Sequence, residues 1–368
     1  MNIAIDIRST LKQKTGIGYY TLNLIQHLAE ADKKDNYFLY SQKGIFSRDK
    51  KLPKLPAKNF THLVNRFKTN PAALLKKAHV LHTSSYDLSK PQQCRLVLVV
   101  HDVIQKAYPL AHAMKTVKDI DESLKKVLPL ADRIIVDSQT TAKDLARFYE
   151  VDKAKIRLVY PGVNTDIAAA KIKILSEKEL NKKLKVTLPY ILYVGTIEPR
   201  KNVEGLIRAF GILKKDFKVA HRLVVCGMKG WGCEDIFSLV KDRELEKEII
   251  FTGYVSRSEL KSLYTRAEMF VYPSFYEGAG LPILEAFSFG LPVVTSNVSS
   301  TAEIAAEAAM LVDPYSYPAI AWAMLRIIKD EHLKKLLKQR ALGRVNEFSW
   351  SEAARKTMEI FGELDGPR

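Results

Sequence analysis

Residues 274–286, Ser-Phe-Tyr-Glu-Gly-Ala-Gly-Leu-Pro-Ile-Leu-Glu-Ala, place two carboxylates around a glycine-rich turn that a proline continues into a helix. Backbone donors at Gly280 and Leu281 would then lie at a helix N-terminus, which favours a bound anion such as a diphosphate. Glu277 before the helix and Glu285 inside it would flank that anion, and each carboxylate can accept hydrogen bonds from hydroxyl groups. The segment therefore predicts a site for a sugar nucleotide.

A second candidate segment, residues 198–202 (Glu-Pro-Arg-Lys-Asn), follows an apolar strand pattern and opens a helix. Arg200 offers a planar fork for paired phosphate oxygens, and Lys201 supplies a compact charge beside it. When a glycosidic bond to a diphosphate breaks, negative charge collects on the departing phosphate, so these cations would stabilise the transition state. The alternative is a solvated helix start, and Glu198 is a further candidate to cap or orient the pair.

His101 ends another apolar run and is followed by Asp102. A histidine at a strand end is more often a packed structural residue than a catalyst, and Asp102 is open to orienting a ligand or capping the next segment. Gly16 and Gly18 precede the predicted helix 19–31, where glycine lets the backbone approach a ligand closely, although a tight turn needs the same residues.

Neither a metal site nor a disulfide framework is indicated. Asp119 and Asp121 form an Asp-x-Asp pair, but they lie in a helical pattern where residues two apart face different ways. The three cysteines, Cys94, Cys226 and Cys233, are too few and too scattered for a disulfide framework or a four-ligand zinc site. We expect them to be reduced and buried, and we expect the protein to need no cofactor or metal.

The chain has 368 residues, of which 47% are hydrophobic and 27% charged, and this composition fits two soluble domains. No apolar stretch is long enough to span a bilayer, and the first residues read as a strand in place of a signal peptide, so a cytoplasmic protein is expected. The net charge is +17, and residues 1–165 hold 28 Lys and Arg against 15 Asp and Glu. Such a basic surface attracts nucleic acid, anionic membrane or phosphorylated substrates. Without a recognisable nucleic-acid module, peripheral contact with lipid head groups or a lipid-diphosphate acceptor is the economical interpretation, and a merely soluble basic face is an equal alternative.

Short apolar runs alternate with helical patterns in both halves of the chain, which predicts an α/β fold with parallel sheets covered on both faces. The strands expected in the first half are 3–7, 37–40, 80–83, 96–101, 133–137 and 155–159. Those expected in the second half are 190–194, 222–226, 249–251, 269–271, 292–295 and 309–311.

Two doubly wound, Rossmann-like domains result, with the Lys-rich residues 167–188 as an exposed linker and leading segment. We expect an N-terminal domain over 1–165, a C-terminal domain over 166–345 and a terminal segment over 346–368 that carries the last helix. Open α/β sheets bind ligands beyond the carboxyl ends of their strands, so a cleft faced by both domains is the expected reaction site.

Residues 274–286 resemble the Glu-x7-Glu motif of retaining glycosyltransferases of family four, which have the GT-B architecture. The resemblance spans nearly the whole chain and matches a subgroup that includes many mannosyltransferases of polysaccharide assembly. Its other motifs are residues 15–19, 100–102, 161–164, 194–202, 251–255 and 346–350.

The resemblance implies roles for individual residues. Glu277 would contact hydroxyls of the donor sugar and Glu285 the ribose, while His101 would lie against the donor sugar near its anomeric carbon. The nucleotide base would lie near Tyr254 and Val255. The donor-binding set would be completed by Gly16, Gly18, Gly278, Ala279, Gly280 and Leu281.

The resemblance also implies a metal-independent, retaining hexosyltransferase whose last helix crosses back to the N-terminal domain. The donor would be a nucleotide-diphosphate sugar, with GDP-mannose preferred and a UDP-sugar such as UDP-glucose or UDP-GlcNAc as the alternative. The acceptor would be a glycan or a lipid-linked glycan of cell-surface polysaccharide, including lipopolysaccharide. Other classes remain as alternatives: a sugar phosphorylase or nucleotide-sugar epimerase with the same fold, or a non-enzymatic basic binder of nucleic acid or membrane surfaces.

Overall fold

The computed structural model describes residues 1–11, 16–42, 52–65, 70–87, 93–111, 114–163 and 171–366. The chain forms two compact units, one of Met1–Lys106, Lys115–Gly162 and Ser349–Arg368, and one of Ala107–Met114 and Val163–Phe348. The boundaries expected from the sequence, 165/166 and 345/346, lie close to the points where the chain leaves and re-enters the first unit. Thr15 and Asn164, which belong to two of the motifs above, lie outside the described residues.

The first unit contains a seven-stranded sheet in which every strand pair is parallel, with the order β3-β2-β1-β4-β5-β6-β7 among the described residues. Its strands are β1 (Asn2–Asp6), β2 (Asn36–Gln42), β3 (Phe60–Asn65), β4 (Val80–Thr83), β5 (Arg95–Val100), β6 (Arg133–Val136) and β7 (Ile156–Leu158).

Apolar residues on successive positions of these strands pack into two different cores, because side chains of a strand alternate between its faces. In β5, Val97 and Val99 join one core, while Leu96, Leu98 and Val100 join the other. The continuous apolar run of this strand is therefore explained by burial on both faces of a parallel sheet.

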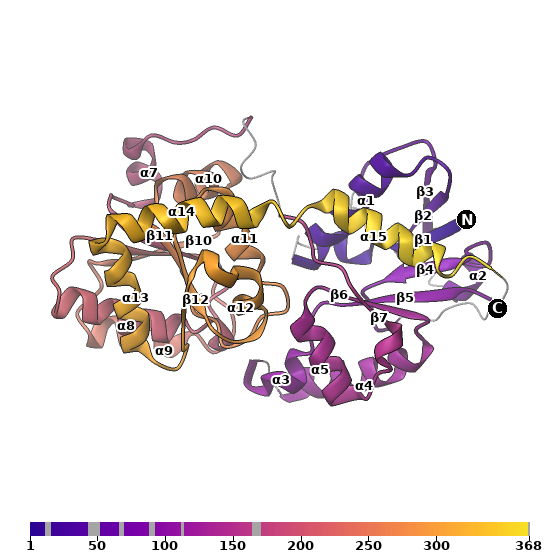
Figure 1. Ribbon diagram of the computed structural model, residues 1–368, viewed down its shortest axis with the longest axis horizontal. Coiled ribbons are helices and arrows are strands. Elements are labelled where there is room, and N and C mark those ends of the chain that lie inside the picture. The colour runs from indigo at the N-terminus through magenta and orange to yellow at the C-terminus, as the bar shows by residue number, and fades with distance from the viewer. Residues whose placement is uncertain are drawn as a thin grey trace. The chain divides into compact units, whose positions relative to one another are not determined.

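Helices cover both faces of this sheet (Figure 1). Helix α1 (Gly16–Ala31) and the C-terminal helix α15 (Trp350–Gly362), drawn in yellow, pack against each other and share one core. Helices α4 (Met114–Val127) and α5 (Gln139–Tyr149) contribute to the core on the other face. The two short helices are α2 (Pro71–Leu74) and α3 (Ile104–Ala107).

The second unit contains a six-stranded parallel sheet with the order β10-β9-β8-β11-β12-β13 in the part of the chain that the structure describes. Its strands are β8 (Tyr190–Val194), β9 (Arg222–Cys226), β10 (Ile249–Gly253), β11 (Met269–Tyr272), β12 (Val293–Ser296) and β13 (Met310–Val312). Numbered within the unit, this is the 3-2-1-4-5-6 order of the Rossmann fold. Both sheets therefore confirm the predicted doubly wound α/β class.

The helices of the second unit precede its first strand, occupy the crossovers between its strands and follow its last strand. They are α7 (Glu177–Leu184), α8 (Val203–Lys215), α9 (Glu234–Asp242), α10 (Arg257–Arg266), α11 (Leu281–Ser288), α12 (Ser299–Ala305), α13 (Tyr317–Lys329) and α14 (Glu331–Val345). Helix α8 packs on α13, and α11 packs on α14.

Three sequence predictions differ from the structure. Strand β3 was not expected, because polar residues interrupt its apolar pattern and it lies at the edge of the sheet, paired with β2 alone. Residues 167–188 are more than an exposed linker: α7 has a complete capping box at Ser176, and its Leu180 is buried. Helix α1 begins at Gly16 and not at Tyr19.

Gly162 gives a direct test of how the terminal helix is held. A Cβ atom at this position would lie 2.2 Å from the backbone nitrogen of Trp350 and 2.6 Å from its ring. We expect Gly162→Ala to displace the start of α15 and to lower the free energy of unfolding by about 1–3 kcal/mol in urea denaturation.

Gly343 in α14 is the matched control, since a Cβ there meets nothing within 4 Å. Gly343→Ala should raise the free energy of unfolding by about 0.5–1 kcal/mol because alanine favours the helix. Equal stability of Gly162→Ala and the wild-type protein would show that the close contact with Trp350 does not hold the helix.

Candidate functional site

The loops after β8 and β11 carry the two charged motifs of the second unit. These strands are neighbours at the point where the strand order reverses, which is the usual ligand-binding position of an open α/β sheet. The loops touch directly: the backbone nitrogen of Phe275 donates to the carbonyl of Arg200 at 2.8 Å. Sheet order thus brings together segments that are more than seventy residues apart.

Glu277 lies at the centre of a buried cluster of charges. Its Oε2 is 2.7 Å from Arg200 Nη1, and its Oε1 is 2.6 Å from Lys201 Nζ. Arg200 Nη2 also pairs with Glu198 at 2.8 Å, and Lys201 Nζ donates to the Tyr272 hydroxyl at 2.5 Å. The structure therefore brings together four residues that the sequence had singled out: Glu198, Arg200, Lys201 and Glu277. It adds Tyr272, which belongs to none of the motifs.

The electrostatics of the cluster follow from its burial and its pairing. Burial alone would raise the pKa of Glu277, but the charges of Lys201 and Arg200 outweigh it and lower the pKa to about 2. Burial lowers the pKa of Lys201, and Glu277 opposes this effect. The charges of the two cations and the two carboxylates balance. Because Glu277 accepts hydrogen bonds from both Arg200 and Lys201, a diphosphate bound by these cations would compete with Glu277 for the same donors.

Asn202 and two serines fix the backbone around these charges. Asn202 adopts a left-handed conformation (φ 54°), caps α8 through Gly205 and donates to the carbonyls of Pro273 and Pro314 at 3.0 and 2.7 Å. The backbone nitrogen of Glu277 donates to Ser299 Oγ at 3.2 Å, and Ser300 Oγ donates to the Glu277 carbonyl at 2.8 Å. Both serines begin helix α12, so the start of this helix positions the backbone of Glu277.

The glycine-rich turn enters α11 as predicted. Gly280 caps the helix with φ 61°, a conformation that favours glycine, and Pro282 lies in the first turn. Gly278 is buried and Ala279 half-buried, while Leu281 is the first helical residue. The role of this turn in binding a diphosphate stays a prediction.

Glu285 makes its contact away from Glu277. Its Oε2 accepts from the Tyr264 hydroxyl at 3.0 Å. Burial raises the pKa of Glu285 to about 7, although the hydrogen bond from Tyr264 opposes the rise. The pKa of Glu277 is therefore lowered and that of Glu285 raised, a difference that the sequence did not indicate.

Tyr254 and Val255 follow β10 directly. Tyr254 is 75% exposed, while Val255 is buried. An exposed aromatic ring next to a strand end is available for stacking on a nucleotide base. Its role in binding the base stays a prediction.

In the first unit, His101 follows the carboxyl end of β5 and pairs with a residue that the sequence did not single out. Its Nδ1 lies 2.6 Å from Oδ2 of Asp137, which follows the neighbouring strand β6. Asp102 Oδ1 accepts from the backbone nitrogen of Ile104 at 3.3 Å, which fits the capping alternative. The only signal for Asp137 in the sequence was its place at the end of an apolar strand.

Gly16 and Gly18 lie inside the first turns of α1 and not in a loop before it. A Cβ at Gly18 would lie 2.9 Å from the Ser9 carbonyl, so this glycine permits close packing of α1 on the turn Arg8–Leu11. Gly16 faces open space. Contact of either glycine with a ligand stays a prediction.

Of the two aspartates considered as metal ligands, Asp121 has structural partners and Asp119 is exposed. Asp121 lies in α4, accepts from the Tyr149 hydroxyl at 2.7 Å and forms ion pairs with Lys106 and Lys125. Among the described residues, no three His, Cys, Asp or Glu side chains are grouped as metal ligands. The three cysteines are buried and free of disulfides, as predicted.

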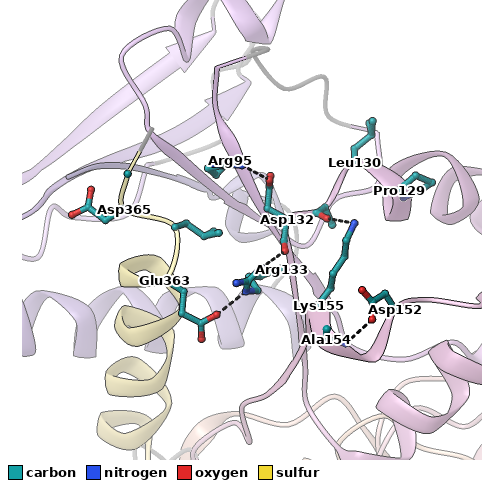
Figure 2. A pocket seen from close by; sticks show the side chains of 13 residues that line it. Arg95, Pro129, Leu130, Asp132, Arg133, Asp152, Ala154, Lys155, Glu363 and Asp365 are labelled. Carbon is teal, nitrogen blue, oxygen red and sulfur yellow. Dashed lines mark hydrogen bonds and ion pairs between the residues drawn. The ribbon is translucent and has the colours of Figure 1, made fainter. Parts of the chain in front are cut away.

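A cavity of about 680 Å³ in the first unit is lined by none of these motif residues. Figure 2 shows the residues that do line it. Arg95 and Arg133, which line it, begin strands β5 and β6, so the cavity is at the amino ends of strands whose carboxyl ends lead to His101 and Asp137. Arg133 pairs with Glu363 at 2.6 Å, and Arg95 with Asp132 at 3.1 Å. Both arginines of this cavity are paired with carboxylates, so we do not assign it to the site.

The fold and these two groups of residues define a glycosyltransferase of the GT-B class. Residues 158–344 match the family described as "Glycosyl transferases group 1", and residues 14–167 match "Glycosyltransferase Family 4". Since the first match covers just over half of the chain, the protein belongs to the glycosyl transferases of group 1.

Several curated proteins are similar to the chain. O-antigen chain mannosyltransferase B of Escherichia coli is 28% identical over 373 residues, which cover 94% of this chain and 96% of that protein. The serotype-specific mannosyltransferase WbdA of Escherichia coli is 29% identical over 295 residues, and this alignment covers 77% of this chain but only 36% of WbdA.

Solved structures share the fold over nearly the full length. A sucrose-phosphate synthase from Thermosynechococcus elongatus aligns with a TM-score of 0.76 at 22% identity, covering 99% of this chain and 98% of that one. WaaG, a glycosyltransferase involved in lipopolysaccharide biosynthesis, aligns with a TM-score of 0.70 at 16% identity, covering 97% and 99%. In the described parts of the chain, no helix combines the length and the apolar character that crossing a bilayer requires.

The raised pKa of Glu285 predicts a pH-dependent cost to folding. Between the ordinary value of 4.5 and about 7, the folded protein binds more protons than the unfolded chain, so stability falls as the pH rises through this range. Glu285→Gln removes the ionised form. We expect it to raise the free energy of unfolding relative to wild type by about 1–3 kcal/mol more at pH 8 than at pH 5.

The measurement is urea denaturation at the two pH values without ligand. Glu204→Gln, on the exposed face of α8, is the control and should show no such difference. A gain in stability that is equal at pH 5 and pH 8 would contradict a raised pKa of Glu285 in the folded protein.

Proposed function

We propose that this glycosyltransferase moves a hexose, with mannose from GDP-mannose as the preferred donor, to a glycan or lipid-linked glycan of a cell-surface polysaccharide such as lipopolysaccharide. The observation that carries the proposal is the buried cluster of Arg200, Lys201 and Glu277 at the switch point of a Rossmann-type sheet. The names of its mannosyltransferase relatives support mannose as the sugar.

In the proposed reaction, Arg200 and Lys201 hold the diphosphate of the donor. The bond between the anomeric carbon and the phosphate oxygen breaks, and the electron pair stays on the phosphate as leaving group. The two cations stabilise this growing charge in a buried site, where electrostatic interactions are stronger than in water. The acceptor hydroxyl forms the new bond on the same face of the sugar and passes its proton to the departing diphosphate, so the configuration is retained.

Once the diphosphate takes the two cations, Glu277 is released to accept hydrogen bonds from sugar hydroxyls. Glu285 contacts the ribose, and Tyr254 stacks on the base beside Val255. The glycine-rich turn from Gly278 to Leu281 supplies backbone donors to the phosphates. In the first unit, His101 and the helix that begins with Gly16 and Gly18 are the residues that would contact substrate.

The excess of Lys and Arg in residues 1–165 supports peripheral contact with the anionic inner face of the membrane, where a lipid-diphosphate acceptor would lie. The reaction proceeds without a metal because Arg200 and Lys201 supply the positive charge that a divalent ion supplies elsewhere. Addition of EDTA should therefore leave the transfer rate unchanged, and loss of activity that Mn²⁺ or Mg²⁺ restores would contradict this part of the proposal.

The donor is tested by thermal shift with GDP, UDP, ADP and their sugars. A ligand that binds only the folded protein raises its melting temperature, and we expect GDP and GDP-mannose to give the largest rise. A larger rise with UDP, UDP-glucose or UDP-GlcNAc would replace mannose transfer by the UDP-sugar alternative. Salt-dependent retention of DNA without any response to nucleotides would support the non-enzymatic binder.

Lys201→Ala and Glu277→Ala test the charged cluster. We expect each to lower kcat with the donor so identified by about 10²-fold or more, since each removes stabilisation of the transition state. Lys215→Ala, at the exposed end of α8, is the charge-matched control and should retain normal activity. Circular dichroism checks that the variants fold, and near-normal turnover of a folded Lys201→Ala protein would overturn the assignment.

A further inference from the structure

At the His101–Asp137 pair and the ring of Tyr20 beside it, three buried polar atoms have no hydrogen-bond partner among the described residues. They are His101 Nε2, Asp137 Oδ1 and the hydroxyl of Tyr20. Tyr20 contacts the imidazole edge to face, with ring centroids 4.8 Å apart. Buried polar groups in native proteins are almost always satisfied, so this cluster is arranged for an oxygen that a water or a substrate supplies.

The pair also fixes how the imidazole can act. Oδ2 of Asp137 lies 2.6 Å from Nδ1, and since a carboxylate only accepts hydrogen bonds, Nδ1 carries a proton. Nε2 is then the one ring nitrogen left to meet a ligand. The carbonyl of His101 is held as well, because it accepts from Thr141 Oγ1 at 3.3 Å at the start of α5.

We propose that Asp137 is the positioning residue of His101: it orients the ring through Nδ1 and keeps it as an imidazolium, so that Nε2–H donates to a substrate oxygen and cannot serve as a general base. The participation of His101 in glycosyl transfer rests on the proposed function. The charge and the orientation of the ring do not depend on the proposed function, because they follow from contacts within the first unit.

The surroundings of His101 favour the charged form. Burial of the ring lowers its pKa, but the charge and hydrogen bond of Asp137, assisted by Asp102, outweigh burial and raise it. His82 on β4 also faces this region, and burial holds its pKa at about 4, so it is neutral and adds no competing positive charge at neutral pH. Tyr20, whose pKa burial and Asp137 raise, also stays neutral.

An imidazolium at this position has a defined chemical use. It can donate to a sugar hydroxyl or to the departing phosphate, and its charge favours negative charge that grows in the transition state. Activity should then require the protonated ring and be lost as the pH rises through the pKa of His101. A general base would give the opposite dependence, with activity lost as the pH falls.

The first test is an NMR titration of the full chain labelled at histidine, without substrate. The signal of His101 is identified by its absence in His101→Gln. We expect its midpoint to lie above the ordinary histidine value of about 6.5, and to move to lower pH in Asp137→Asn. Asp119→Asn, an exposed carboxylate on α4, is the control and should leave the midpoint unchanged.

The second test is the pH profile of kcat/KM for the donor found by thermal shift, since this ratio reports the pKa values of the free enzyme. In Asp137→Asn the alkaline limb should move to lower pH by the same amount as the NMR midpoint. At pH 8 kcat/KM should fall by about 10- to 100-fold, the loss that is typical when the carboxylate that orients a metal-bound histidine is removed. A purely structural Asp137 would lower the activity equally at every pH.

An unchanged midpoint in Asp137→Asn, or a wild-type midpoint below the ordinary value, would overturn the proposal. An activity that instead rises on deprotonation of His101 would also reject it. If Asp137→Asn does not fold, the ¹⁵N shifts of the wild-type ring at pH 7 still decide between an imidazolium and a neutral tautomer. Failure of the protein to transfer any sugar would count against the proposed function. The NMR titration would still test whether Asp137 keeps His101 protonated.

Discussion

The pairing of Glu277 with Arg200 and Lys201 is the interaction on which the second unit depends. Taking these charges out of water is costly, and the cost is offset only because each cation meets a carboxylate at hydrogen-bond distance. Removal of any one partner would leave an uncompensated buried charge. The surrounding backbone is accordingly fixed, by Asn202 on one side and by Ser299 and Ser300 on the other.

The two units solve the same positioning problem in the same way. In each, a charged residue follows the carboxyl end of an apolar strand, and the segment after the neighbouring parallel strand supplies its partner at the same end of the sheet. The first unit joins His101 after β5 to Asp137 after β6, and the second joins Arg200 after β8 to Glu277 after β11. The charged cavity at the amino ends of β5 and β6 has its own internal pairs and no such motif.

Burial explains where prediction from the sequence succeeded. Central strands such as β8 and β9 lie between layers of helices, so their sequences are almost entirely apolar and stand out from the helical patterns, and their predicted bounds agree with the structure. Strand β3 is half-buried at an edge, and α7 is short and Lys-rich, so neither carries a strong pattern. Both depend on neighbouring elements that local periodicity does not encode.

By itself, the sequence determined the doubly wound α/β class, the motif residues and the chemistry that their side chains can perform. Tertiary structure alone decided their partners. It brings Asp137 within hydrogen-bond distance of His101, and Tyr264 within hydrogen-bond distance of Glu285. It also places Glu277 between two cations that lie 76 and 77 positions away in the chain. The physical reason is that the order of strands in a sheet sets which loops meet. That order results from packing the whole unit, whereas propensity and spacing report only on residues that are close in the chain.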